Sequence, residues 1–251
     1  MCRKMDEIFK YLPPERIDVL ESRKMRLSQP CCLNDPHDAL VAIRSRLEEQ
    51  DGEARVLNDD FYLERQYSNM LREDYSRQLG VLCFSSSKHS VLMWSHYARN
   101  HTGFLIHFNT QDSFFDRKLV WKESFGLESE YEGLPHPSPV RYLDIRPTYY
   151  IQDGIPWEVL FIKSIHWSYE MEYRSLMNLS DGKMVESTKD DLCPVYLIEF
   201  SPSVISGVTL GLAASNENRK RIIECCKNLK VPVYQIRTKH LSFDLKSVLA
   251  Y

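Results

Sequence analysis

Apolar residues gather in short runs along this chain, and most runs end at proline, glycine or serine. Such runs are typical of buried strands, because four to eight apolar residues between turn residues suit a sheet better than a helix. They predict strands at "IFKYL", "LGVLCFSSS", "GFLIHF", "PVRYLD", "VYLIEF" and "VPVYQI", which begin at residues 8, 79, 103, 139, 195 and 231. A further strand is expected at 25–27.

Periodic and more charged segments separate these runs and predict helices. They are expected around Ile17 and Leu20, within 39–79, and at 215–229. In the segment 90–103, Ser90 is a good N-cap and Gly103 a good C-terminal stop, so a helix of two to three turns is predicted. "PWEVLFIKSIHWS" (156–168) is interpreted as a helix that begins at its proline.

The strands outnumber those of a simple strand-helix alternation, which favours the α+β class. We expect one domain over residues 1–251, with a mixed, largely antiparallel sheet flanked by helices. The charged segment 39–79 is predicted to be a helical insertion. The proline-containing stretch around 110–139 reads as an irregular insertion.

The segment "HWSYEMEYRSLM" (166–177) alternates between two kinds of residue and predicts a half-buried strand. Glu170, Glu172 and Arg174 would then project from one face of that strand. One hypothesis is a solvent-exposed face in which Arg174 pairs with the carboxylates. The other is an acid/base or ribose-binding pair in a cleft, because catalytic carboxylates are often grouped in this way.

Composition narrows the class of protein only a little. The formal net charge of -3 and a hydrophobic fraction of 43% describe an ordinary globular protein with no overall basic field for nucleic acid. The start lacks a signal-peptide core and no apolar run reaches about 20 residues, so we expect a cytoplasmic protein that does not enter membranes. The seven cysteines include no CxxC pair, which predicts free thiols.

Several common catalytic motifs are missing from the sequence. Ser85 and its neighbours lack a Gly-x-Ser-x-Gly elbow, and neither a Walker loop nor a dinucleotide Gly-x-Gly-x-x-Gly is present. His96 and His101 are five positions apart, so they do not form a zinc pair on a helix, and no metal site is predicted. Trp94 and Tyr97 share a helix face that suits either core packing or the wall of a cleft.

Five uncommon segments occur in a recognisable order: "LNDPHD", "LCFSSS", "LMWSHYARNHTGFLIHF", "VRYLD" and "WSYEMEYRSL". In this respect the chain resembles the prokaryotic family known as domain of unknown function 2971. The resemblance runs from about "FKYLP" to "VTLGLAAS" and implies a bacterial protein. The family carries no established activity.

The order of parts also resembles that of ADP-ribosyltransferases: a basic residue on an early strand, a strand ending in serines, and a late Glu-x-Glu segment. The resemblance implies an ADP-ribosyltransferase-like fold and NAD as the substrate. Glu172 would be the catalytic carboxylate and Glu170 would engage the acceptor. Position 10 is lysine, whereas the arginine-serine-glutamate branch of the ADP-ribosyltransferase superfamily has arginine or histidine there. The implied NAD-binding residues are Lys10, Tyr11, Ser85, Ser86, Trp94, His96, Tyr97 and Arg174.

Three hypotheses about function follow. The first is an NAD-consuming enzyme, a mono-ADP-ribosyltransferase that acts as a toxin or phage-defence effector on a macromolecular acceptor, nucleic acid included. The second is a non-catalytic sensor or interaction domain encoded in a defence operon. The third is a nuclease that holds Mg²⁺ with Asp35, Glu170 and Glu172, because carboxylates suit that ion.

Overall fold

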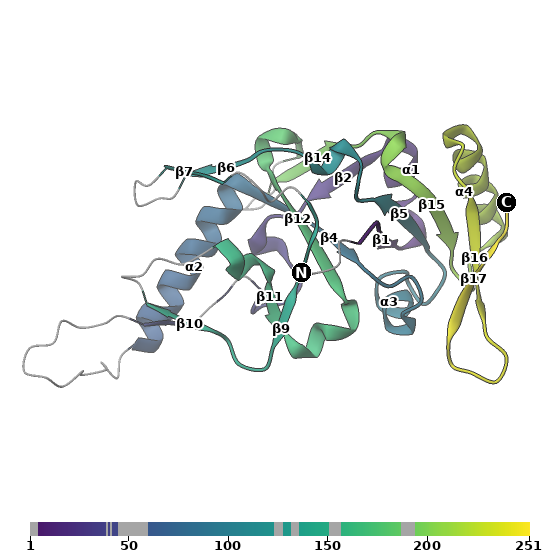
Figure 1. Ribbon diagram of the computed structural model, residues 1–251. Coiled ribbons are helices and arrows are strands. Elements are labelled where there is room, and N and C mark those ends of the chain that lie inside the picture. The colour runs from purple at the N-terminus through teal and green to yellow at the C-terminus, as the bar shows by residue number, and fades with distance from the viewer. Residues whose placement is uncertain are drawn as a thin grey trace, which may run out of the picture.

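A computed structural model describes residues 5–38, 40, 42–44, 60–122, 128–131, 136–150, 157–186 and 194–251. An eight-stranded sheet forms the centre of the molecule (Figure 1). Its strands lie in the order β17 (Leu245–Leu249), β16 (Val233–Thr238), β15 (Ile205–Leu210), β5 (Phe104–Asn109), β1 (Glu7–Leu12), β4 (Leu79–Ser85), β12 (Glu172–Asn178) and β8 (Ser138–Pro139). Neighbouring strands are antiparallel, apart from the parallel pair β15 and β16. The predicted α+β class with a mixed, largely antiparallel sheet is therefore confirmed.

Smaller sheets surround the large one. A three-stranded sheet contains β13 (Lys183–Glu186), β14 (Val195–Glu199) and β2 (Lys24–Leu27). Three further pairs join β3 (Ala42–Arg44) to β10 (Thr148–Tyr150), β9 (Arg141–Leu143) to β11 (Ile162–Ser164), and β6 (Leu119–Lys122) to β7 (Glu128–Tyr131). The strand expected at 195 thus belongs to a smaller sheet, and β15 is the strand that precedes the last helix.

The helices are short except for two. They are α1 (Asp18–Ser22), α2 (Asp60–Gln78), α3 (Val91–His96) and α4 (Asn216–Leu229). Short 3-10 segments lie at Pro14–Arg16, Pro30–Cys32, Ser113–Phe115, Trp157–Phe161, Ile165–Glu170, Leu179–Asp181 and Pro202–Val204. The α4 helix connects β15 to β16, and this crossover allows the two strands to run parallel.

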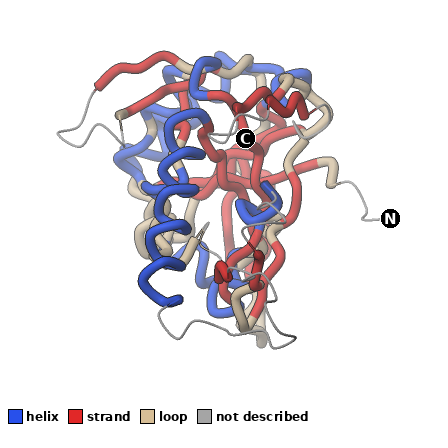
Figure 2. Tube along the Cα trace, turned by 90° about the vertical axis from the view of Figure 1, so that its left-hand side faces the viewer, coloured by secondary structure: helices blue, strands red, loops and turns tan. Residues whose placement is uncertain are grey.

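The two faces of the large sheet carry different layers, because successive residues of a strand point to opposite sides. On one face, Ile8 and its neighbours pack against α1, α4 and the β13–β14–β2 sheet. On the other face, Tyr75 of α2 belongs to the same apolar cluster as Val81, while Trp94 of α3 packs edge-on against Tyr11 with ring centres 5.2 Å apart. Figure 1 shows α2 and α3 well separated along this face, and Figure 2 shows α2 along the side of the molecule.

The helix predicted for 90–103 is shorter than expected. Ser90 caps α3 as predicted, its Oγ accepting from the Met93 N–H. The helix ends at His96, and the residues that follow include three with left-handed backbones: Arg99, Asn100 and His101, with φ of 47°, 53° and 64°. Gly103 does not end the helix. It is needed for close packing, because a Cβ there would lie 2.1 Å from the Leu12 carbonyl oxygen.

Two predictions around residue 165 are wrong. The segment 157–168 is not one helix but a 3-10 segment, the strand β11 and a second 3-10 segment, because Ile162–Ser164 pairs with β9. The segment 166–177 is not one strand either. Its first part is the 3-10 segment that ends at Glu170, Met171 is left-handed with φ of 45°, and β12 begins only at Glu172.

The two predicted insertions differ from expectation. The first contains α2 but also β3, and residues 45–59 lie outside the described residues. The second is not wholly irregular, since β6 and β7 pair within it.

No helix in the described ranges is long and apolar enough to cross a membrane. The thiols of Cys83, Cys225 and Cys226 are free, as predicted. Cys32 is disulfide-bonded, so the prediction of free thiols is wrong at that position.

Candidate functional site

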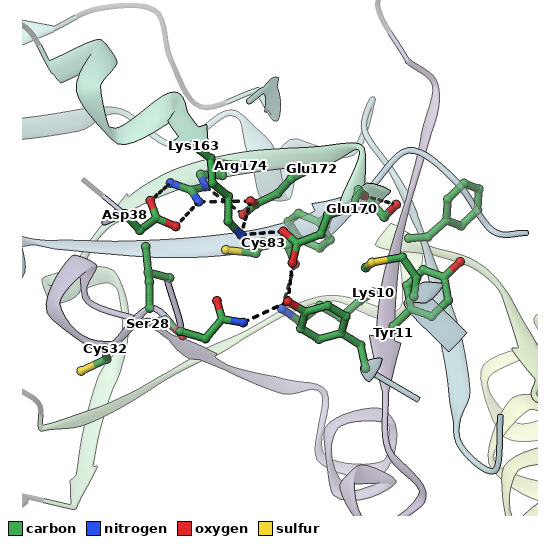
Figure 3. A pocket seen from close by; sticks show the side chains of 17 residues that line it. Lys10, Tyr11, Ser28, Cys32, Asp38, Cys83, Lys163, Glu170, Glu172 and Arg174 are labelled. Atoms are coloured by element: carbon green, nitrogen blue, oxygen red, sulfur yellow. Dashed lines mark hydrogen bonds and ion pairs between the residues drawn. The ribbon is translucent and has the colours of Figure 1, made fainter. Parts of the chain in front are cut away.

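A cavity of about 270 Å³ opens on the sheet face that carries α3 (Figure 3). The strands β1, β4 and β12 place Phe9, Ser85 and Glu172 in one cross-strand row beneath it. Its lining residues are Phe9, Lys10, Tyr11, Ser28, Cys32, Leu33, Asn34, Asp38, Cys83, Phe84, Ser85, Met93, Tyr97, Lys163, Glu170, Glu172 and Arg174.

Arg174 lines the cavity and is fully buried. Its Nη1 and Nη2 donate to the two Asp38 carboxylate oxygens at 2.7 and 2.6 Å, and Nη1 also donates to the Leu160 carbonyl at 2.6 Å. Its Nε donates to Glu172 Oε1 at 2.8 Å. The planar guanidinium therefore joins two carboxylates at once, which suits arginine better than lysine.

Lys163 joins the two glutamates (Figure 3). Its ammonium Nζ lies 2.5 Å from Glu170 Oε2 and 3.2 Å from Glu172 Oε2. The same Nζ stands 4.7 Å from the centre of the Trp167 ring. On the other side, the Tyr97 hydroxyl donates to Glu170 Oε1. Glu170 and Glu172 are both 4% exposed, so they do not form a solvated face.

The pKa values of the two carboxyls move in opposite directions. Burial raises the pKa of Glu170, and the attraction of Lys163 only partly offsets it. Burial would also raise the pKa of Glu172, but Arg174 and then Lys163 overcome this and lower it to about 2. For Lys163, burial is outweighed by both carboxylates, which raise its pKa. Glu172 is therefore held ionised, whereas Glu170 is the group that takes up a proton more readily.

A kink between the glutamates brings them together. Met171 takes a left-handed backbone, and its carbonyl accepts hydrogen bonds from the Ser86 N–H at 2.9 Å and Oγ at 3.2 Å. The Ser85 hydroxyl donates to the Glu170 carbonyl at 2.7 Å. The two serines predicted to shape a ligand site thus hold the backbone between the carboxylates, and Ser85 also lines the cavity.

The other predicted residues fall into two groups. Lys10 and Tyr11 line the cavity; Lys10 Nζ donates to the Cys83 carbonyl at 2.8 Å, and the Tyr11 hydroxyl donates to the Ser87 carbonyl at 2.8 Å. Trp94 and His96 are not among the lining residues. Trp94 is fully buried, which confirms the core role considered for it.

The aspartate of the proposed magnesium site is elsewhere. Asp35 does not line the cavity; it is buried, with Oδ1 accepting from the His37 N–H. Among the residues that the structure describes, no group of three or more His, Cys, Asp or Glu could hold a metal ion. The glutamates instead contact Lys163 and Arg174. The predicted trio of Asp35, Glu170 and Glu172 is therefore not brought together.

The structure adds residues that the sequence reasoning missed. Asp38 is the aspartate that reaches the site, and it ends the turn "LNDPHD". Lys163 is the single charged residue inside the apolar run "VLFIKSI". A single lysine in an apolar run predicts a buried charge that needs an ionic partner. This pattern could have identified Lys163 from the sequence. Tyr142 also contributes, because its hydroxyl accepts from the Glu172 N–H at 2.8 Å.

Fold and site together define an α+β protein with a buried cluster of lysine, arginine and carboxylates beside a small cavity. Residues 93–175 match the family described as "Protein of unknown function (DUF2971)". The predicted resemblance to that family is thus confirmed, over a narrower range than the sequence segments suggested. Comparison with curated proteins and with solved structures finds no match.

Proposed function

We propose that this site consumes NAD by cleaving the bond between nicotinamide and ribose, and passes the ADP-ribosyl group to an acceptor. The observation that carries the proposal is the pair Glu170 and Glu172, whose pKa values are displaced in opposite directions within one cavity. When the pKa values of two carboxyls differ in this way, one commonly transfers a proton while the other stays ionised and stabilises positive charge, as in glycosidic-bond cleavage.

The proposed roles follow from the contacts. Glu172, kept ionised by Arg174, stabilises the positive charge that develops on the ribose as the bond to nicotinamide breaks. Glu170 accepts the proton of the attacking acceptor. Tyr97 and Lys163 hold the two Glu170 oxygens in position.

Lys10 is the candidate for the NAD phosphates. Burial lowers its pKa, and one of its three N–H donors contacts the Cys83 carbonyl. An anionic ligand would favour its charged form. Because Lys10, Ser85 and Glu172 come from three adjacent strands, one substrate can reach all of them.

The test is nicotinamide release from NAD by the purified chain, comparing wild type with Glu172→Gln. We expect a loss of roughly 10²- to 10³-fold, the usual effect of removing one electrostatic stabiliser. Glu199→Gln is the matched control, since Glu199 is exposed on β14, and it should behave as wild type. Wild-type protein that releases no nicotinamide, or an undiminished Glu172→Gln, would contradict the proposal.

A further inference from the structure

We infer that the acceptor is water or a similarly small hydroxyl compound, so that the protein hydrolyses NAD instead of modifying a macromolecule. This inference rests on the proposed function and specifies its second substrate. It follows from the size, closure and charge of the space around Glu170.

The cavity has little room for a second large substrate. Its volume of about 270 Å³ lies just below the range of roughly 300–1,000 Å³ that holds one drug-sized ligand. The nicotinamide riboside part of NAD is itself of that size class, whereas a water molecule occupies only about 30 Å³. With the nicotinamide riboside part of NAD in the cavity, the remaining space suits a water molecule better than a protein side chain with its backbone.

Glu170 is closed off from the surface where a macromolecule would dock. Its side chain is 5% exposed, and both carboxylate oxygens are in contact, one with Tyr97 and one with Lys163. Asn34 donates from Nδ2 to the Tyr97 hydroxyl at 3.0 Å, which holds the Tyr97 ring beside Glu170. An acceptor must reach Glu170 from inside the cavity.

The position of Lys163 also disfavours cationic acceptors, although the lining as a whole is balanced. Three cationic and three acidic side chains line the cavity: Lys10, Lys163, Arg174, Asp38, Glu170 and Glu172. The charge nearest the acceptor is that of Lys163, whose Nζ lies 2.5 Å from the Glu170 carboxylate that would take the proton of the acceptor. A protein arginine or lysine would bring a second cation next to Lys163, at a cost that rises in a buried setting. A neutral hydroxyl group meets no such repulsion.

The reaction balances with water alone. The bond between ribose C1′ and the nicotinamide nitrogen breaks, and its electron pair stays on nicotinamide, which leaves as a neutral molecule. The water oxygen forms a bond to C1′, and its proton passes to Glu170. Release of that proton to solvent completes the conversion of NAD and water to ADP-ribose, nicotinamide and a proton.

The experiment incubates the full chain with NAD labelled in its adenylate part, with bacterial lysate present, and measures nicotinamide, free ADP-ribose and label bound to macromolecules. Free ADP-ribose should equal nicotinamide, one to one. Added methanol should give methyl ADP-ribose in proportion to its concentration, while free ADP-ribose falls by the same amount. Both measurements use wild-type protein, so misfolding of a variant cannot obscure them.

The possible failures differ. Nicotinamide release with most of the label on protein or nucleic acid would overturn the small acceptor and leave NAD consumption standing. The absence of methyl ADP-ribose at high methanol, with free ADP-ribose unchanged, would also count against an acceptor pocket open to small hydroxyl compounds. No nicotinamide release at all would overturn both proposals. Glu170→Gln should reduce hydrolysis and methanolysis by the same factor, because both use the same base.

Discussion

Two polar networks lie on the same face of the sheet, and only one adjoins the cavity. In the first, Lys163 and Arg174 join Glu170 and Glu172. In the second, which we call the histidine network, His107 Nδ1 lies 3.3 Å from Glu7 Oε1 and Nε2 lies 2.7 Å from the Thr209 hydroxyl.

The histidine network has the order acid, histidine and hydroxyl that hydrolases use, yet its histidine and its hydroxyl are buried. His107 is 2% exposed and Thr209 is fully buried, and Tyr234 stacks on His107 with ring centres 5.6 Å apart. Neither His107 nor Thr209 lines the cavity. Suitable residue types and hydrogen bonds are therefore not enough for a reactive site, because a substrate also needs space beside them.

The largest expected effect comes from Arg174→Met. It would leave Asp38 and Glu172 as buried charges without their shared partner, at a cost of about 3–5 kcal/mol in the free energy of unfolding. Denaturant unfolding measures this. Arg237→Met, at an exposed position of β16, is the control and should stay within about 0.5 kcal/mol of wild type. An equal loss in both variants would mean that Arg174 has no special role.

The next effect separates the two networks. Thr209→Val should cost about 1–3 kcal/mol in stability, because His107 Nε2 loses its partner in the interior. Nicotinamide release by the folded variant should equal that of wild type, since the histidine network lies outside the cavity. Thr238→Val, on an exposed site, should change neither quantity. Loss of turnover in folded Thr209→Val would place the histidine network in the reaction.

Lys163→Met should change the pH profile of nicotinamide release. Lys163 lowers the pKa of Glu170 against the effect of burial, so its removal lets Glu170 take up a proton at higher pH. The acidic limb of the profile should move to higher pH, with about a tenfold loss at pH 7, a part of the 10²–10⁴ that base catalysis supplies. Lys163→Arg should restore the limb, and exposed Lys183→Met should leave it in place. A purely structural lysine would lower activity equally at all pH values.

The smallest effect concerns acid stability. Burial would raise the pKa of Glu7, but His107, Ser206 and Lys88 lower it from 4.5 to about 2. A depressed folded-state pKa stabilises the protein above pH 4.5, and this contribution is lost as the pH falls toward 2. Glu7→Gln should flatten stability against pH in that window. Because the Glu7 side chain is 33% exposed, the effect should be small and weaker in 1 M salt. An unchanged slope in Glu7→Gln would mean that other carboxyls carry the acid sensitivity.

Sequence periodicity identified most of the sheet because the buried strands are apolar runs with clear ends. It also identified Glu170, Glu172 and Arg174. The prediction that all three project from one face of a single strand is wrong for Glu170, which precedes β12. The period of two holds from Glu172 onward only. A left-handed methionine leaves no mark in the sequence, since it depends on hydrogen bonds from serines 85 positions away.

Lys163 and Asp38 could not be placed from local sequence for a similar reason. Lys163 lies on a three-residue strand that exists because of its pairing with β9, and the same letters fit a helix. Asp38 ends a turn and lies 136 positions before Arg174 in the sequence, so the fold of the chain between them sets their proximity. Charge pairs at such separation follow from tertiary packing, which local propensities do not contain.

The kink at Met171 also bears on protein design. A designer who transplanted "EMEYR" as a straight strand would place both carboxylates side by side on its face without the turn that presents Glu170 to Lys163 and Tyr97. The smallest unit that could be transferred instead has three segments: the bend at Met171, the end of β4 with its serines, and β11 with Lys163. Glycine is the natural replacement for Met171 in such a graft, since it adopts positive φ without steric cost.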